Sequence, residues 1–144
     1  MRYFQVQPEV AGGFGPHTIL DTSANRLAHH AVQTLHYVFD GWLGDEIIGS
    51  TPCLLVTQRL ADSIKRHGLT GVNFDQVEIS RSTLFDEMYP DRELPPFVWM
   101  KVDGTKWAAD LFLAEAERLV VSERAWELMK AFATNAIVSD FTAC

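Results

Sequence analysis

One pattern occurs twice in this sequence, first over residues 54–65 and again over residues 119–130. Each copy starts as a short apolar run, continues with a hydroxyl residue and ends as an amphipathic stretch that closes on a lysine. Thr57 and Ser122 hold the hydroxyl position, where a side-chain oxygen can accept a hydrogen bond from the first helical turn. The pattern therefore predicts a strand leading into an N-capped helix at both places. A duplication and the shared rules of helix capping both account for the similarity.

The two predicted helices, over about 57–67 and 122–132, determine the fold class that we expect. Their apolar stripes need the face of a sheet to cover them. The sequence therefore predicts an α+β fold, in which a mainly antiparallel sheet packs with these two principal helices. With 144 residues, the chain is of a length that suits a single globular domain over residues 1–144. The residues expected in its core are Trp99, Leu60, Ile64, Trp126, Met129 and Val121.

Alternating apolar and polar residues, together with clusters of turn residues, predict the remaining elements. The glycine-rich residues 12–16 are expected to form a loop, and a short helix is expected around residues 84–88. Asp103-Gly104 lies between two strand-like runs, 97–102 and 105–107, which predicts a β-hairpin. The further strands that we expect cover residues 3–7, 17–20, 30–39, 72–79 and 135–138.

The sequence contains no motif that is typical of a catalytic or cofactor site. It lacks a nucleophile elbow and a phosphate-binding loop. Cys53 lies beside an apolar strand, and such surroundings raise the pKa of a thiol rather than lower it. His29, His30 and His36 lie close in sequence but match no recognised metal-ligand spacing, so structural or solvated histidines are the simpler interpretation. We therefore predict no enzymatic activity, no cofactor and no metal site.

The whole chain has a formal net charge of −7, and its acidic residues are concentrated in the second half. This charge disfavours binding to nucleic acid and favours a basic protein partner. Acids alternate with aromatic residues between positions 75 and 93, an arrangement that suits a protein interface. The predicted partner-binding residues are Asp75, Glu78, Phe85, Asp86, Glu87, Tyr89, Asp91 and Glu93. A solvated loop whose two aromatic side chains fold inward is the alternative.

Composition also bears on the cellular compartment. Cys53 and Cys144 provide no disulfide framework, which favours a reducing environment. No apolar run approaches the length of a membrane span, and the first residues are more typical of a strand than of a signal peptide. We therefore expect a cytoplasmic protein that does not contact membranes.

Several segments together resemble a known family, most clearly over residues 45–140. They are residues 52–60, 68–74, 77–79, 99–104, 110–113, 119–123 and 135–138. These segments resemble the bacterial immunity proteins that are encoded beside polymorphic, contact-dependent toxins, a family long catalogued only as domains of unknown function. The resemblance implies an antidote that binds and blocks a cognate toxin, and it supplies no catalytic motif. The family often has paired acids where this chain has only Asp110. A regulatory module that binds a small ligand or a protein, without catalysis, is the alternative.

Overall fold

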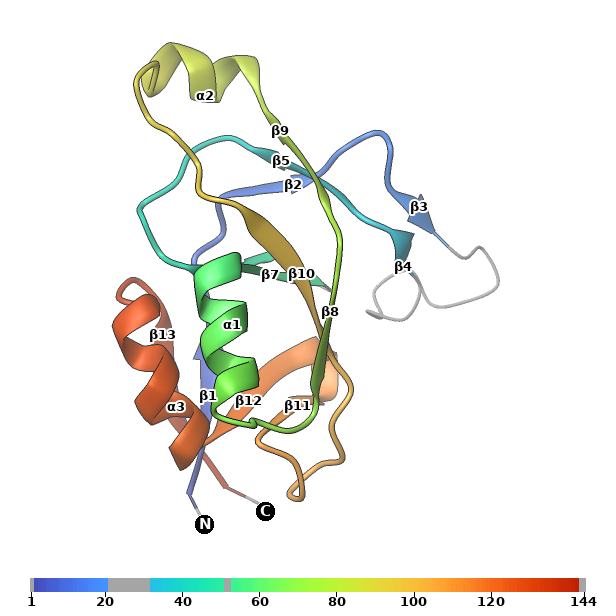
Figure 1. Cartoon of the computed structure of the whole chain (residues 1–144), viewed down its shortest axis with the longest axis vertical. Helices are drawn as coiled ribbons and strands as arrows, with labels where there is room; N and C mark the ends of the chain where they lie inside the picture. Colours follow the sequence, from blue (N-terminus) through green and yellow to red (C-terminus); the bar gives the residue numbers. More distant parts are fainter. Residues whose placement is uncertain (1, 21–31, 51–52, 143–144) are drawn as a thin grey trace.

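The computed structural model describes residues 2–20, 32–50 and 53–142. In these ranges the chain forms the predicted α+β fold, with mostly antiparallel strands (Figure 1). The strands are divided among several sheets, however, rather than joined in the one sheet that we expected. The predictions for His29, His30 and Cys144 concern residues outside these described ranges.

The first sheet joins the two ends of the described chain. Its strands are β1 (Tyr3–Gln7), β11 (Leu111–Ala114), β12 (Arg118–Ser122) and β13 (Ile137–Phe141). They lie in the order β11-β12-β1-β13, and all neighbours are antiparallel. A short 3-10 turn, Glu115–Glu117, separates β11 from β12. One face of this sheet contributes to the main hydrophobic core, and the other carries a small aromatic cluster around Phe112.

The second sheet lies at the centre of the molecule and is buried on both faces. Its strands are β6 (Ile47–Ser50), β7 (Cys53–Thr57), β8 (Val72–Asp75) and β10 (Phe97–Val102), in the order β6-β7-β10-β8. Leu54, Val56 and Met100 point into the main core beneath the helices, whereas Leu55 and Trp99 point into a second core. Burial on both faces explains why β7 is a continuous apolar run in the sequence.

The third sheet covers the second core. It consists of β2 (Gly12–Phe14), β5 (His36–Phe39) and β9 (Glu78–Arg81), and β9 pairs with β5 in parallel. Tyr37 and Phe39 point inward and are fully buried. A separate two-stranded ribbon is formed by β3 (Ile19–Leu20) and β4 (Val32–Thr34).

The two principal helices form as predicted. They are α1 (Gln58–Arg66) and α3 (Glu123–Met129), which a 3-10 turn continues to Phe132. Thr57 and Ser122 cap them by accepting hydrogen bonds from the backbone amides of Leu60 and Ala125. The helices lie side by side in Figure 1, and Arg124 donates to the carbonyls of His67 and Gly68 at the end of α1. The expected short helix is also present, as α2 (Thr83–Met88).

The core prediction is confirmed for Trp99, Leu60, Ile64, Met129 and Val121, which are all buried. It is wrong for Trp126, which is only partly buried at the margin of the main core. The inward face of α3 is formed by Ala125 and Met129, four residues apart, so the neighbouring tryptophan lies to one side of the buried stripe.

Residues 12–16 do not form only a loop, because Gly12–Phe14 is a strand. A β-carbon at Gly12 would lie 1.9 Å from the carbonyl oxygen of Val38 on the paired strand. The glycine therefore permits a close approach between two strands, which a local reading of the sequence interprets as loop composition.

The hairpin predicted at Asp103-Gly104 is also wrong. Strand β10 pairs with β7 and β8, and residues 105–110 form turns in which Trp107 has a φ of 64°. Two longer predicted strands are interrupted. The 72–79 run divides into β8 and β9, which belong to different sheets, and the described part of the 30–39 run breaks at Leu35.

Candidate functional site

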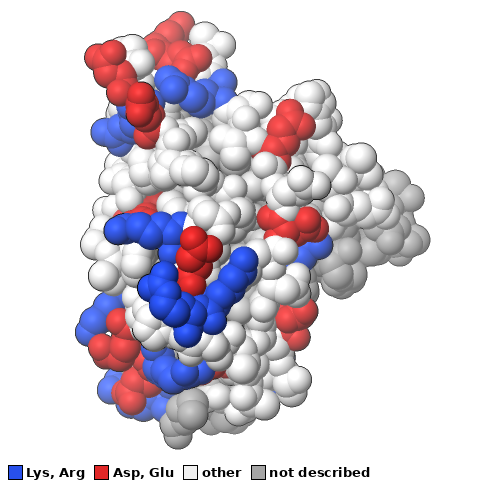
Figure 2. All heavy atoms as spheres, in the orientation of Figure 1, with Lys and Arg blue, Asp and Glu red and all other residues white. Residues whose placement is uncertain are grey.

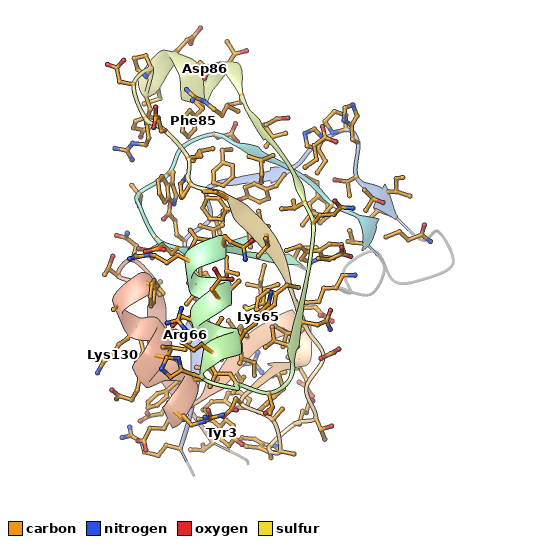
Figure 3. The ribbon with its side chains drawn as sticks, in the orientation of Figure 1. Tyr3, Lys65, Arg66, Phe85, Asp86 and Lys130 are labelled. Atoms are coloured by element: carbon orange, nitrogen blue, oxygen red, sulfur yellow. The ribbon has the colours of Figure 1, made fainter. Side chains whose placement is uncertain are left out.

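Helix α2 projects from the end of the molecule opposite the two chain termini (Figure 1). A helix of only six residues is marginal by itself, so its neighbours must hold it. Ser82 caps its first turn by accepting from the amide of Phe85, and the Phe85 ring is fully buried in the second core. Figure 3 labels Phe85 on the body side of α2 and Asp86 on the helix above it.

A stack of alternating charged and aromatic groups braces this helix. The Arg81 guanidinium lies 4.6 Å above the Phe85 ring, the Phe85 and Tyr89 rings are 5.7 Å apart, and the Arg92 guanidinium lies 4.9 Å from Tyr89. Arg81 also pairs with Asp86 at 2.8 Å, and Arg92 donates to the carbonyl oxygen of Trp42. These contacts hold α2 in one orientation.

The predicted partner-binding residues do not form one continuous patch. Asp86, Glu87, Asp91 and Glu93 are exposed on α2 and the segment after it, where Figure 2 shows acidic side chains gathered among arginines at the top of the view. Asp75 lies at the end of β8, where a hydrogen bond from Lys101 lowers the pKa of its carboxyl. Glu78 lies on β9 and contacts two histidines.

The structure brings the two aromatic residues of this segment inward, as the alternative interpretation proposed. Phe85 has no exposed surface and Tyr89 is partly buried, so Phe85 cannot contact a partner in this conformation. Leu84 and Met88 instead face outward and are 50% and 60% exposed. The sequence analysis did not select them, although their spacing of four residues places them on one helical face.

Three shallow hollows surround the base of α2. They measure about 440, 380 and 420 Å³. Trp42 lines both the first and the second, and Glu93 and Leu94 line both the first and the third. The buried carboxylate of Glu9 fixes the loop that lines the first two of these hollows. Glu9 accepts from the amides of Leu43 and Asp45, and burial raises the pKa of Glu9 despite these two hydrogen bonds. The surface at the α2 end of the molecule is thus hollowed, and hydrogen bonds to Glu9 fix the loop beneath it.

A larger cavity of about 490 Å³ lies between the first and second sheets. Its lining is mostly apolar and includes Val6, Leu54, Leu119 and Cys53. Burial raises the pKa of the Cys53 thiol to about 12, as expected from its apolar neighbours, so at neutral pH it is protonated and a poor nucleophile. Ala116 and Glu117, at the rim, both have left-handed φ values near 60°.

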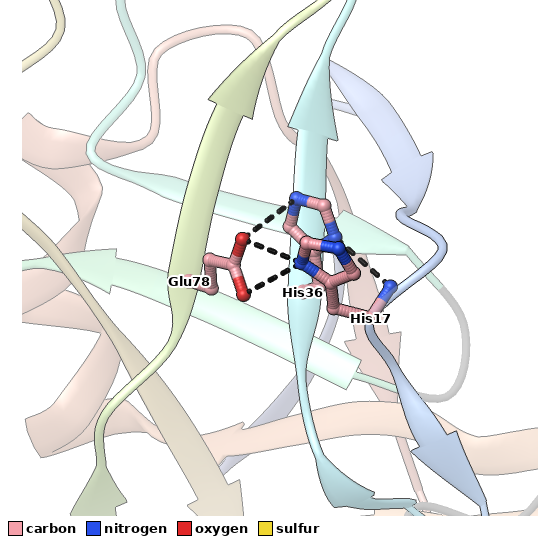
Figure 4. Close-up of side chains that lie close together, drawn as sticks. All are labelled: His17, His36 and Glu78. Atoms are coloured by element: carbon pink, nitrogen blue, oxygen red, sulfur yellow. Dashed lines mark hydrogen bonds and ion pairs between the residues drawn. The ribbon is translucent and has the colours of Figure 1, made fainter.

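His36 has two partners that the sequence analysis did not identify. Its ring stacks on that of His17, and its Nε2 lies 3.6 Å from a carboxylate oxygen of Glu78 (Figure 4). Among the described residues, these three form the one group of histidine, cysteine and acidic side chains that could hold a metal, with ligand atoms within 4.8 Å of one another. The parallel register of β5 and β9 places His36 opposite Glu78.

The hydrogen bonds around His36 favour a structural role over a metal site. The backbone amide of His17 donates to Nδ1 of His36 at 3.2 Å, so Nδ1 is an acceptor and Nε2 carries the proton. That Nε2 lies 2.8 Å from the hydroxyl of Ser80 and has no lone pair left for a metal. Glu78 contacts the same nitrogen, whereas a catalytic triad requires the carboxylate at the other one.

Asp110 is the residue that the family resemblance singled out, and its carboxylate joins three segments. It accepts hydrogen bonds from the amide of Thr70, the hydroxyl of Ser122 and the guanidinium of Arg124, at 3.0, 2.8 and 2.9 Å. Burial opposes ionisation of this carboxyl, but the hydrogen bonds outweigh it and lower its pKa to about 2. Asp110 therefore holds the loop after α1 to the start of α3.

Acidification should expose this contribution of Asp110 to stability. Its pKa in the folded protein lies below the ordinary value of 3.8, so the stabilisation is complete above about pH 4 and is lost as the pH falls towards 2. We expect Asp110→Asn to lower the free energy of unfolding by about 2 kcal/mol at pH 7 and to flatten its dependence on pH between about 4 and 2. Urea denaturation across this pH range measures both effects. Asp62→Asn, at an exposed position on α1, is the control, and an equal flattening there would contradict the assignment.

The chain matches no protein-family model, and no curated protein matches it either. In the described part of the chain, no helix is long and apolar enough to cross a membrane.

Proposed function

We propose that this chain is an immunity protein that binds a cognate bacterial toxin domain in the cytoplasm and blocks it without catalysis. The observation that carries the proposal is the acidic helix α2, which projects from the molecule and is braced in one orientation. The family resemblance of residues 45–140 supports the same function. An acidic surface suits a basic partner, as expected for a toxin whose substrate is anionic.

Rigidity matters for a protein that acts only by binding. A segment that is ordered before it meets its partner loses less conformational entropy on binding. The capped first turn, the buried Phe85 and the stacked Arg81 and Arg92 provide this order at α2. Asp86 and Glu87 on the helix and Asp91 after it stay exposed, where they can attract a cationic surface from a distance.

The regulatory module is a second candidate, and the 490 Å³ cavity is the observation that favours it. Its volume is in the range of small-molecule sites, and its lining is mostly apolar. A small ligand held there would touch both the first and the second sheet. Thermal denaturation with a library of apolar metabolites tests this candidate, since a ligand bound in the cavity would raise the melting temperature.

The primary test of the immunity function is rescue from toxicity. The chain is co-expressed in bacteria with the product of each neighbouring open reading frame, and cell growth is scored. We expect one product to be toxic alone and harmless together with this chain. The absence of any such product would contradict the proposal.

With that toxin domain in hand, charge reversal at α2 should slow association. We expect Asp86→Lys, Glu87→Lys and Asp91→Lys together to reduce the association rate constant about tenfold at low salt, and less as salt screens the attraction. Surface plasmon resonance at several salt concentrations measures the rate. The control combines Asp62→Lys, Glu115→Lys and Glu127→Lys, three exposed acids on other elements that give the same net charge. If both variants associate equally slowly, the net charge of the protein and not the position of the acids at α2 determines the rate. If the α2 variant associates as fast as the wild type, the interface lies elsewhere.

A further inference from the structure

We propose that Leu84 and Met88 form the apolar centre of the contact, and that the toxin domain receives them in an apolar groove bordered by lysine and arginine side chains. This inference rests on the proposed immunity function and specifies the partner surface. It also replaces the predicted anchors Phe85 and Tyr89, which the structure turns towards the core.

Helix α2 and its C-cap residue Tyr89 carry two apolar pairs with the same spacing, and only one of them packs against the second core. Phe85 and Tyr89 face the body of the molecule, where Phe85 is fully buried and Tyr89 packs against it. Leu84 and Met88 lie one position earlier, about 100° around the helix, and are half or more exposed. The fold therefore leaves an ordered apolar pair without a partner in the described part of the chain.

The position of this pair distinguishes it from the exposed apolar side chains of Ile19 and Ile137. Ile19 and Ile137 are as exposed but lie on strands remote from the projecting helix, and scattered apolar residues are common on protein surfaces. Leu84 and Met88 share one face of a braced helix, and spacings of this kind insert into grooves in helix-in-groove recognition.

The charges around the pair specify the border of the groove. Asp86 and Glu87 lie on α2 between the two apolar residues, and Asp91 follows within the next turn of chain. Arg81 pairs with Asp86 and lies over the Phe85 ring, so the exposed Glu87 and Asp91 supply the net negative charge of the margin. A partner groove bordered by acids would be repelled, whereas basic side chains would pair with this rim. An apolar centre within a polar rim is the usual anatomy of a protein interface.

The two parts of the surface should affect different rate constants. Long-range attraction by the acids accelerates encounter, whereas close packing of the apolar pair acts only after contact and slows dissociation. We therefore expect Leu84→Ala with Met88→Ala to raise the dissociation rate constant at least tenfold, with an association rate constant within about twofold of the wild type. Alanine preserves helix propensity, so α2 should remain folded.

The experiment uses the toxin domain that the wild-type chain neutralises on co-expression. Surface plasmon resonance compares the wild type, the double alanine variant and a control carrying Ile19→Ala and Ile137→Ala, and thermal melts verify that all three are folded. Faster dissociation in the double variant alone, with an unchanged salt dependence of association, supports the inference. Unchanged dissociation, or equal effects in the control, overturns it while the immunity function stands. If no toxin is neutralised, both proposals fail together.

A second copy of this chain is the competing occupant of the face formed by Leu84 and Met88. Light scattering after size-exclusion chromatography measures the mass of the wild type and the double variant. A wild-type dimer that becomes a monomer on Leu84→Ala with Met88→Ala would assign the face to a second copy of the chain and overturn the inference.

Discussion

Replacing Trp99 with alanine should lower the free energy of unfolding by about 3–5 kcal/mol, because it removes a large buried ring and leaves a cavity. Trp99 is 2% exposed, in the middle of β10, and packs into the core between the second and third sheets. The Nζ of Lys101 also lies 4.4 Å from the centre of the ring, so a cation–π contact is lost as well. Urea denaturation followed by circular dichroism measures the loss.

Trp126→Ala is the matched comparison. The two substitutions remove the same atoms, but Trp126 is only partly buried, so its loss should cost clearly less than that of Trp99. Equal losses would contradict the inward orientation of Ala125 and Met129 on α3.

Gly71→Ala should be comparably severe, for a different reason. Gly71 has a φ of +89°, and a β-carbon there would lie 2.1 Å from the carbonyl oxygen of Leu111 and 3.0 Å from the α-carbon of Gly104. Backbone strain and overpacking together should cost about 3–5 kcal/mol. Gly68→Ala is the control, since Gly68 has a φ of +65° with no atom within 4 Å of a new β-carbon. We expect that variant to lose only about 1 kcal/mol, and similar melting temperatures for the two variants would refute the close contact.

Local signals predicted the helices well because helix capping is a short-range interaction. Thr57 and Ser122 each accept a hydrogen bond from an amide three residues later, so a few neighbouring residues specify the start of each helix. The left-handed stop at Gly68 is equally local. These features established both principal helices and, through their apolar stripes, the α+β class.

The errors arose where a residue's role depends on a distant partner. Gly104 was interpreted as a hairpin turn, yet a β-carbon there would lie 2.0 Å from the carbonyl oxygen of Leu111, so it too permits a close approach. His36 was grouped with its sequence neighbours, whereas its contacts come from His17, in the turn after β2, and from Ser80 on the paired strand β9. Such pairings have no signature in a short window of sequence.

The candidate site shows a third kind of error, which concerns orientation. Over residues 84–89, Leu84 with Met88 and Phe85 with Tyr89 are apolar pairs with the same spacing, and helical periodicity cannot indicate which pair faces the core. The acidic residues Asp86, Glu87, Asp91 and Glu93 were predicted by their charge and are exposed, and their role in binding stays a prediction. The aromatic anchors chosen with them were selected by residue type alone.

The position of β1 has a consequence for synthesis of the protein. This strand lies between β12 and β13, so the first sheet cannot close until residue 141 has left the ribosome. The strands that support α2, in contrast, are complete once residue 102 has emerged. We expect the nascent chain to display its acidic helix on a half-formed body, and to gain its full stability only in the last step of folding.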